Sequence, residues 1–158
     1  MPPFTVRPAR REEAELLSSL CVRSKAHWGY DAEFMRLSLS ALQIDAAAIA
    51  EGRVLVAADE RDVPLGVASC AVHEADVELA HLFVDPGALG RGVGAALFAA
   101  SLQWARDHGH EALLIASDPN ATGFYEKMGA VCIGTVPSDA IPGRSLPLLR
   151  CTLPEPTD

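Results

Sequence analysis

Residues 84–95 read Val-Asp-Pro-Gly-Ala-Leu-Gly-Arg-Gly-Val-Gly-Ala and follow an apolar, strand-like segment at residues 77–84. Glycine occupies every second position from 90 to 94. Three alternating glycines exceed what one tight turn needs, so they favour a loop in which the backbone approaches a ligand closely. A helix is expected directly after the turn, and the free N–H groups at its N-terminus favour an anion. The stretch therefore predicts a phosphate-binding turn, to which Arg91 adds positive charge.

The residues around the turn exclude one class of phosphate-binding loop and leave another open. No Gly-Lys-Ser/Thr follows the turn, which excludes a Walker A loop. Residues 90–95 do match GxGxxA, the dinucleotide fingerprint, and Asp118 after the next strand could serve as its ribose-binding acid. A dinucleotide fold begins at its glycine turn, however, and only about 65 residues remain here. A nucleotide-dependent oxidoreductase is therefore the rival hypothesis.

The periodicity of apolar residues predicts the order of elements along the chain. The expected strands are 4–7, 53–58, 65–73, 77–84, 112–117, 131–136 and 148–153, and the expected helices are 12–25, 31–42, 45–51, 92–107 and 120–128. Helices, a hairpin and then alternating strands and helices are typical of a mixed α/β domain. We expect a single domain over residues 1–158, because a second core would be cramped at this length.

Composition excludes several classes of protein. The chain is 49% apolar and 22% charged, which is typical of a globular domain. Its longest apolar runs are too short to span a bilayer, and no apolar run follows the basic N-terminal residues, so we expect neither membrane association nor a signal peptide. The net charge of −8 without a basic cluster argues against nucleic-acid binding.

The cysteines indicate the compartment. Cys21, Cys70, Cys132 and Cys151 show no CxxC or CxxH spacing, which argues against a zinc site and a disulfide scaffold. We expect buried, reduced thiols, no metal, and a cytoplasmic protein.

Two motifs together resemble the GNAT superfamily of N-acetyltransferases. The run Leu89-Gly90-Arg91-Gly92-Val93-Gly94 is similar to the family's pyrophosphate motif, Q/R-x-x-G-x-G/A, with Leu89 in place of the usual Gln or Arg. The run Asp118-Pro119-Asn120-Ala121-Thr122-Gly123-Phe124-Tyr125-Glu126-Lys127-Met128-Gly129-Ala130 resembles the second motif, N-x-x-A-x-x-F-Y-E-K-x-G-F. The order and spacing of the motifs also agree.

This resemblance implies a GNAT-like fold, a twisted mixed β-sheet flanked by helices, and acetyl-CoA as cosubstrate. It covers the chain from about residue 53 to the end, with Asp118 where Asn is usual and Ala130 where Phe is usual. It also implies that the central strand splays to admit the pantetheine arm. The implied cofactor-binding residues are Leu82, Phe83, Val84, Leu89, Gly90, Arg91, Gly92, Val93, Gly94, Ala95, Asn120 and Phe124.

Acetyl transfer to an amine needs a base, a stabilised oxyanion and a proton donor for the leaving thiolate. Glu78 and His81 are the strongly polar residues of the central strand, and simple alternation places them on opposite faces. Either is a candidate base, and the resemblance favours Glu78. The resemblance also implies Tyr125 as the general acid and a backbone N–H near residues 82–84 as the oxyanion donor. Each side chain could instead have a purely structural role.

The acceptor site is expected at the N-terminal helices and the loop 138–147. His27, Trp28 and Tyr30 could form an aromatic wall for an amine, or simply a packing cluster at a helix end. Arg144 could bind a carboxylate of the acceptor, or be an exposed loop arginine. The expected helix at 92–107 is apolar on more than one side, which suggests a homodimer.

These observations predict an acetyl-CoA-dependent N-acetyltransferase acting on a primary amine of a small molecule or peptide. A non-catalytic acyl-CoA-binding module is a further alternative, and the sequence does not identify the amine.

Overall fold

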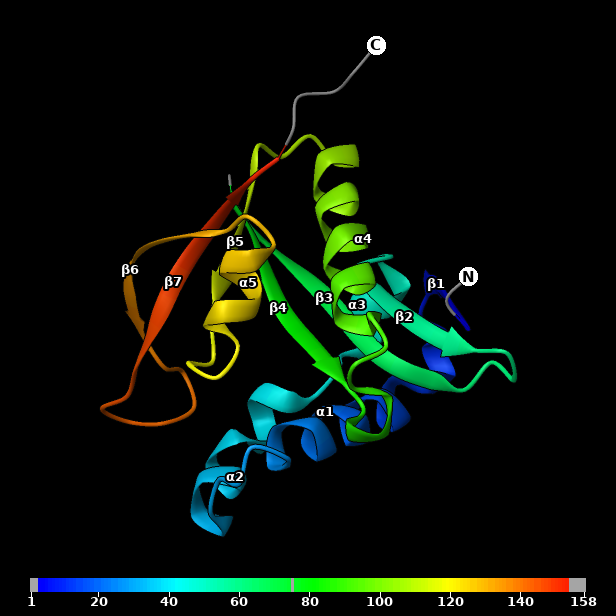
Figure 1. The fold of residues 1–158 in the computed structure, drawn as a ribbon, viewed down its shortest axis with the longest axis horizontal. Coiled ribbons are helices and arrows are strands. Elements are labelled where there is room, and N and C mark those ends of the chain that lie inside the picture. Colours follow the sequence, from blue (N-terminus) through cyan, green and yellow to red (C-terminus); the bar gives the residue numbers. More distant parts are fainter. Residues whose placement is uncertain (1–2, 75, 154–158) are drawn as a thin grey trace.

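The computed structural model of the protein describes residues 3–74 and 76–153. Within them, seven strands form one mixed sheet in the order β1-β2-β3-β4-β5-β7-β6 (Figure 1). The strands are β1 (Phe4–Pro8), β2 (Val54–Asp59), β3 (Pro64–His73), β4 (Asp76–Val84), β5 (Ala112–Ala116), β6 (Val131–Pro137) and β7 (Ser145–Thr152). The α-helices are α1 (Ala14–Ala26), α2 (Ala32–Ser38), α3 (Ala46–Ala50), α4 (Val93–Asp107) and α5 (Thr122–Lys127), and the 3-10 helices are η1 (Arg11–Glu13), η2 (Leu39–Leu42) and η3 (Pro86–Ala88). The expected fold class is confirmed.

The connections exclude the dinucleotide-binding alternative. Strands β1 to β4 are consecutive antiparallel neighbours, α4 then crosses the sheet, and β5 pairs with β4 in parallel. Strand β7 is antiparallel to both β5 and β6. Among the described strands only β4 and β5 are therefore parallel neighbours, whereas a dinucleotide-binding fold needs a mostly parallel sheet.

The sheet separates two apolar cores. One lies under α4 and α5 and includes the fully buried Phe98, Leu97 and Ile115. The other lies under α1 and α3 and includes Leu17 and Leu20. Covering both faces of the central strands explains why their sequences are nearly continuous apolar runs.

Burial differs among the cysteines. Cys21, Cys70 and Cys151 are buried, as expected, whereas Cys132 is exposed. The expectation was wrong for Cys132 because β6 is an edge strand with mostly exposed side chains.

In residues 3–74 and 76–153, no helix combines the length and apolarity that crossing a bilayer requires.

A β-bulge interrupts β4 at its centre. Ser69 of β3 is paired with His81, but the next residue, Cys70, is paired with Leu79. Ala80 is therefore the extra residue on β4. An extra residue reverses the alternation of side chains beyond it and bends the strand.

The bulge corrects the expected placement of two candidate bases. Val77 and Leu79 belong to the core under α4, so Glu78 between them points to the opposite face. Beyond the bulge, Phe83 packs against the core under α1, and His81 alternates with it onto that same face. Glu78 and His81 thus share a face of β4, and the prediction of opposite faces was wrong.

Strands β4 and β5 separate soon after they meet. Their pairing is confined to Val77 with Leu113 and Glu78 with Leu114. Beyond this point β4 remains paired with β3, while β5 remains paired with β7. Figure 1 shows the two strands diverging towards α1 and α2. The splayed sheet implied by the resemblance is present.

The apolar sides of helix α4 are covered by other elements of the same chain. It contacts β1, β2, β3, β4 and β5. Phe98 and Ala105 are fully buried, and the indole N–H of Trp104 donates to the carbonyl of Gly52 at 2.9 Å. The apolar sides of α4 therefore do not require a second subunit, and the homodimer stays a prediction.

Substituting Gly66→Ala should destabilise the fold. A Cβ at Gly66 would lie 2.8 Å from both Leu97 Cδ1 and Val93 Cγ1, which are buried side chains of α4. We expect a loss of about 1–3 kcal/mol in the free energy of unfolding, as in other overpacked cores. Urea denaturation measures it.

The matched control is Gly123→Ala in α5, where an added Cβ meets nothing within 4 Å. Helix propensity should make this variant neutral or slightly more stable. Equal stability of the two variants would show that α4 has room to move away from β3.

Candidate active site

A cleft of about 520 Å³ lies where β4 and β5 separate. Its walls come from the second half of β4, the glycine turn, α5, the C-terminal part of α1, η2 and the β6–β7 loop. The predicted site residues that line it are Glu78, Leu82, Phe83, Val84, Leu89, Gly90, Gly92, Val93, Gly94, Ala95, Asn120, Phe124, Tyr125, Trp28 and Arg144. Arg91, His81 and Tyr30 are not among the described residues that line it.

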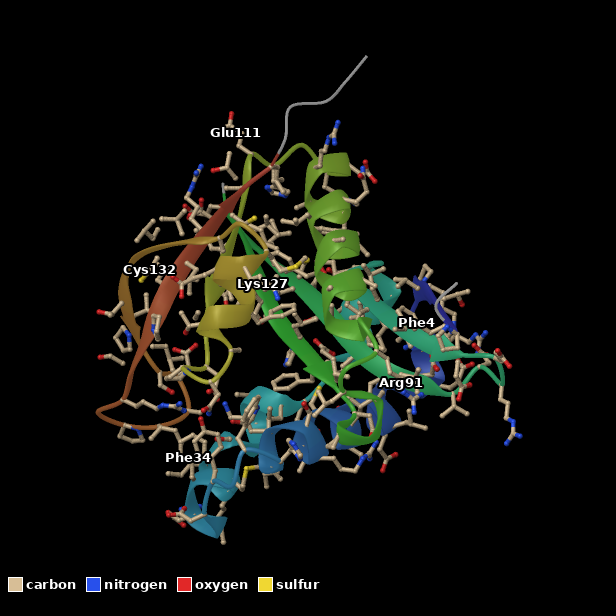
Figure 2. The ribbon with its side chains drawn as sticks, viewed as in Figure 1. Phe4, Phe34, Arg91, Glu111, Lys127 and Cys132 are labelled. Carbon is tan, nitrogen blue, oxygen red and sulfur yellow. The ribbon has the colours of Figure 1, made fainter. Side chains whose placement is uncertain are left out.

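The glycine turn presents unpaired backbone donors to the cleft. Gly90 and Gly92 have φ values of 81° and 79°, a region in which other residues are strained, and Gly92 caps α4. Among the described residues, none accepts a hydrogen bond from the amides of residues 90–95. These donors and the positive end of the helix dipole suit an anion. Arg91 lies in the turn next to α4 (Figure 2) and is exposed.

The backbone of β4 also faces the cleft. The amide of Asp85 donates to the carbonyl of Leu65 at 2.8 Å. In an antiparallel pair, backbone groups alternate between bonding the neighbour and pointing away, so Phe83 also bonds β3. The N–H groups of Leu82 and Val84 therefore point towards the gap left by β5.

Tyr125 carries a hydroxyl that is free among the described residues. Its ring is 6% exposed and packs against Phe98 and Phe124, with centroids 5.6 and 5.2 Å away. Burial raises its pKa far above the usual value, and the nearby charge of Asp118 adds to this. The hydroxyl thus stays protonated near neutrality and can donate a hydrogen bond into the cleft.

Glu78 and His81 have different surroundings although they share a face. The Glu78 side chain is 40% exposed, lines the cleft, and lies 3.5 Å from Nε2 of His73. His81 has partners on both ring nitrogens: Nε2 lies 2.8 Å from the carbonyl of Ala41, and Nδ1 lies 2.6 Å from the hydroxyl of Ser69. A carbonyl only accepts, so Nε2 carries the proton and Ser69 donates to Nδ1. His81 thereby joins β4 to η2.

Asp118 is the centre of a polar network on the side of the cleft formed by α1 and the β6–β7 loop. Its carboxylate accepts from Lys25 Nζ at 2.6 Å, from the Tyr30 hydroxyl at 2.8 Å, and from the Asn120 amide side chain at 3.0 Å. Burial alone would raise the pKa of Asp118, but these hydrogen bonds outweigh it and lower the pKa. The carboxylate therefore remains charged and fastens α1 to the loop after β5.

Arg144 and two aromatic rings extend this network. Nη2 of Arg144 donates to the Tyr30 hydroxyl at 3.1 Å, and the rings of Tyr30 and Phe34 are stacked with centroids 3.9 Å apart. The guanidinium carbon lies 4.8 Å from the Phe34 centroid. Tyr30 thus supports the cleft from behind, whereas Trp28 lines it with an exposed fraction of 51%.

Sequence reasoning missed Lys25 and Phe34 and gave Asp118 no role in this network. Lys25 lies in the last turn of α1, where a basic residue is common. Phe34 resembles any core residue of an amphipathic helix. The available signal was Asp118 itself, because a carboxylate at a position that the resemblance gives to an amide needs a cation nearby. In the described ranges, no group of three or more His, Cys, Asp and Glu could hold a metal ion.

Comparison with known proteins agrees with this geometry. The model of a family described as "Acetyltransferase (GNAT) family" matches residues 17–130. A GCN5-related N-acetyltransferase from Rhodopseudomonas palustris is 28% identical with a TM-score of 0.77, and the match covers 97% of this chain and 98% of that one. YjaB from Escherichia coli is 27% identical with a TM-score of 0.67, covering 97% and 99%.

Two structural neighbours were solved with a coenzyme. The acetyltransferase yncA from Salmonella typhimurium, with acetyl-CoA, is 20% identical with a TM-score of 0.70, covering 98% of this chain and 96% of that one. The PaiA N-acetyltransferase from Thermoplasma acidophilum, with coenzyme A, is 12% identical with a TM-score of 0.73, covering 94% and 98%. No curated protein matches the chain.

Stability should depend on pH through His81. Burial lowers its pKa below the usual 6.5, partly offset by the hydrogen bond to Ala41. Its contribution to stability is therefore complete above about pH 6.5 and is lost as pH falls from 6.5 through the lowered value, by about 1.4 kcal/mol per pH unit. Thermal unfolding between pH 7.5 and 5 should show a smaller loss for His81→Gln than for the wild type. Identical losses would contradict this assignment.

Proposed function

The protein belongs to the GNAT acetyltransferase family, and we propose that it moves the acetyl group of acetyl-CoA directly to a primary amine of a small molecule or peptide. In this reaction the amine nitrogen attacks the thioester carbonyl, the C–S bond breaks, and the amine loses a proton while the sulfur gains one. The observation that carries the proposal is the cleft itself, which joins amides of the glycine turn to the Tyr125 hydroxyl, groups that have no partner among the described residues.

The glycine turn is proposed to hold the diphosphate of the coenzyme. The free amides of residues 90–95 lie at the positive end of α4, where a phosphate is stabilised. Leu89 directly precedes these amides, and the exposed side chain of Arg91, which lies among them, adds positive charge. The coenzyme complexes of yncA and PaiA, which share this fold, support acetyl-CoA as cosubstrate.

The gap between β4 and β5 is proposed to take the pantetheine arm and the thioester. The N–H of Leu82 or Val84 would donate to the oxyanion that forms when the amine attacks. Asn120, Phe124 and Tyr125 line the same cleft. A peptide-like arm would then replace the missing strand in the sheet.

Glu78 is the proposed base and Tyr125 the proposed acid. Glu78 lines the cleft and is half exposed, so it can take a proton from the ammonium and release it to water. Tyr125 has a protonated hydroxyl without a described partner, and can donate to the departing thiolate. His81, with both nitrogens engaged, is better suited to position β4 and η2.

The remaining assignments are parts of the same proposal. Trp28 and Arg144 would contact the acceptor, with Tyr30 supporting Arg144. We also propose a cytoplasmic location from the cysteine spacing, and the homodimer remains a prediction.

The test is release of free thiol from acetyl-CoA in the presence of a panel of amines. The wild type should release thiol only when an amine is present, and Tyr125→Phe should lower kcat by about 100-fold while acetyl-CoA affinity, measured by calorimetry, stays the same. Because the hydroxyl has no described partner, its removal should change the free energy of unfolding only slightly. An unaltered kcat removes Tyr125 as the acid, and an absence of coenzyme binding by the wild type removes the whole proposal.

Replacing the base should change the pH–rate profile. In Glu78→Gln, the part of the pH profile of kcat/KM that reports ionisation of the base should disappear. The rate should then rise with pH until the amine of the substrate itself loses its proton. The matched control is Glu111→Gln, an exposed residue at the far end of the sheet from α2 (Figure 2), whose profile should equal that of the wild type. A wild-type profile for Glu78→Gln would demote Glu78 to a structural role.

A further inference from the structure

The acceptor side of the cleft holds an arginine with unused donors. Arg144 uses Nη2 on the Tyr30 hydroxyl, and among the described residues no acceptor bonds its Nε or Nη1. Its side chain is only 20% exposed, and the residue lines the cleft. An exposed loop arginine would point into solvent, so this arrangement is not the default for a loop residue.

The local charge is not balanced. An Asp118 carboxylate oxygen lies 2.6 Å from Lys25 Nζ and 3.9 Å from Arg144 Nη2. One negative charge therefore faces two positive charges, and one positive charge remains. The cleft-lining Asp139 is exposed to solvent and forms no described ion pair with Arg144. In a chain of net charge −8, this patch is a local site for an anion.

The guanidinium is held in place before any ligand arrives. Phe34 and Tyr30 form a stacked pair beside it, with ring centroids 4.8 and 5.4 Å from Cζ. Figure 2 shows Phe34 on α2, beside the loop that carries Arg144. A preorganised arginine loses little side-chain entropy on binding and presents its planar donors in one direction.

Resting on the proposed function, we infer that the acceptor is an amine that also carries a carboxylate, and that Arg144 binds this carboxylate. A carboxylate has one negative charge, which matches the one uncompensated positive charge, and its two oxygens fit the planar donors. A phosphate dianion would leave an excess negative charge beside Asp118. Glu78 on β4 attracts the ammonium end, so the two ends of a zwitterion meet complementary charges.

The test compares amines in matched pairs. Glycine, β-alanine, γ-aminobutyrate and the common L-amino acids are each paired with their carboxamides, and phosphoethanolamine is added as the phosphate analogue. For at least one pair, kcat/KM for the carboxylate should exceed that for the carboxamide by about 10- to 100-fold, the effect of one charged hydrogen-bonded contact. Arg144→Gln should remove this preference, so that kcat/KM for the carboxylate falls close to that for its carboxamide.

Two controls separate this inference from the proposed function. Arg150→Gln, in β7 outside the cleft, should keep the preference of the wild type. Thermal shifts of the protein with coenzyme A and each member of a pair give a readout that does not need turnover. Equal rates and equal shifts within every pair, or a preference for phosphoethanolamine, overturn the inference. A panel in which no amine reacts overturns the proposed function, and the thermal shifts then decide the inference alone.

Discussion

The separation of β4 from β5 is the constraint on which the rest of the site depends. Each strand pairs over a longer stretch with its other neighbour. Strand β4 pairs with β3 as far as Val84, and β5 pairs with β7 along its whole length. Between them, backbone donors in the middle of a sheet are left without a strand to pair with. Such groups are costly unless something bonds them, so an extended, amide-bearing ligand is the natural partner of this gap.

The β-bulge at Ala80 and the turn at residues 84–95 act together on that gap. The bulge bends β4 and changes which side chains face α1, while the turn starts α4 immediately beyond the end of β4. Close packing of α4 on Gly66 fixes the helix against the sheet. The free amides of the turn and those of β4 consequently open onto one cleft.

Asp118 stabilises the side of the cleft formed by α1 and the β6–β7 loop. A buried carboxylate without a partner would be strongly destabilising, but here Lys25, Tyr30 and Asn120 all bond it. The network joins α1 and the residues after it to the loop between β5 and α5, which lie far apart in the sequence. Arg144 from the β6–β7 loop closes it, so three distant segments form one wall.

Local patterns in the sequence were sufficient for the order of elements, the mixed α/β class and the glycine turn that begins α4. Strand and helix periodicities and positive-φ glycines are short-range properties, and the two motifs lie within one stretch of chain. The pairing between strands could not be predicted from such local patterns. The bulge depends on how β4 pairs with β3, so simple alternation misplaced Glu78 relative to His81. Only the tertiary structure decided that β4 and β5 diverge and that Lys25 meets Asp118 and Tyr30 meets Arg144. These contacts span 93 and 114 residues, so they are set by packing and not by any local periodicity.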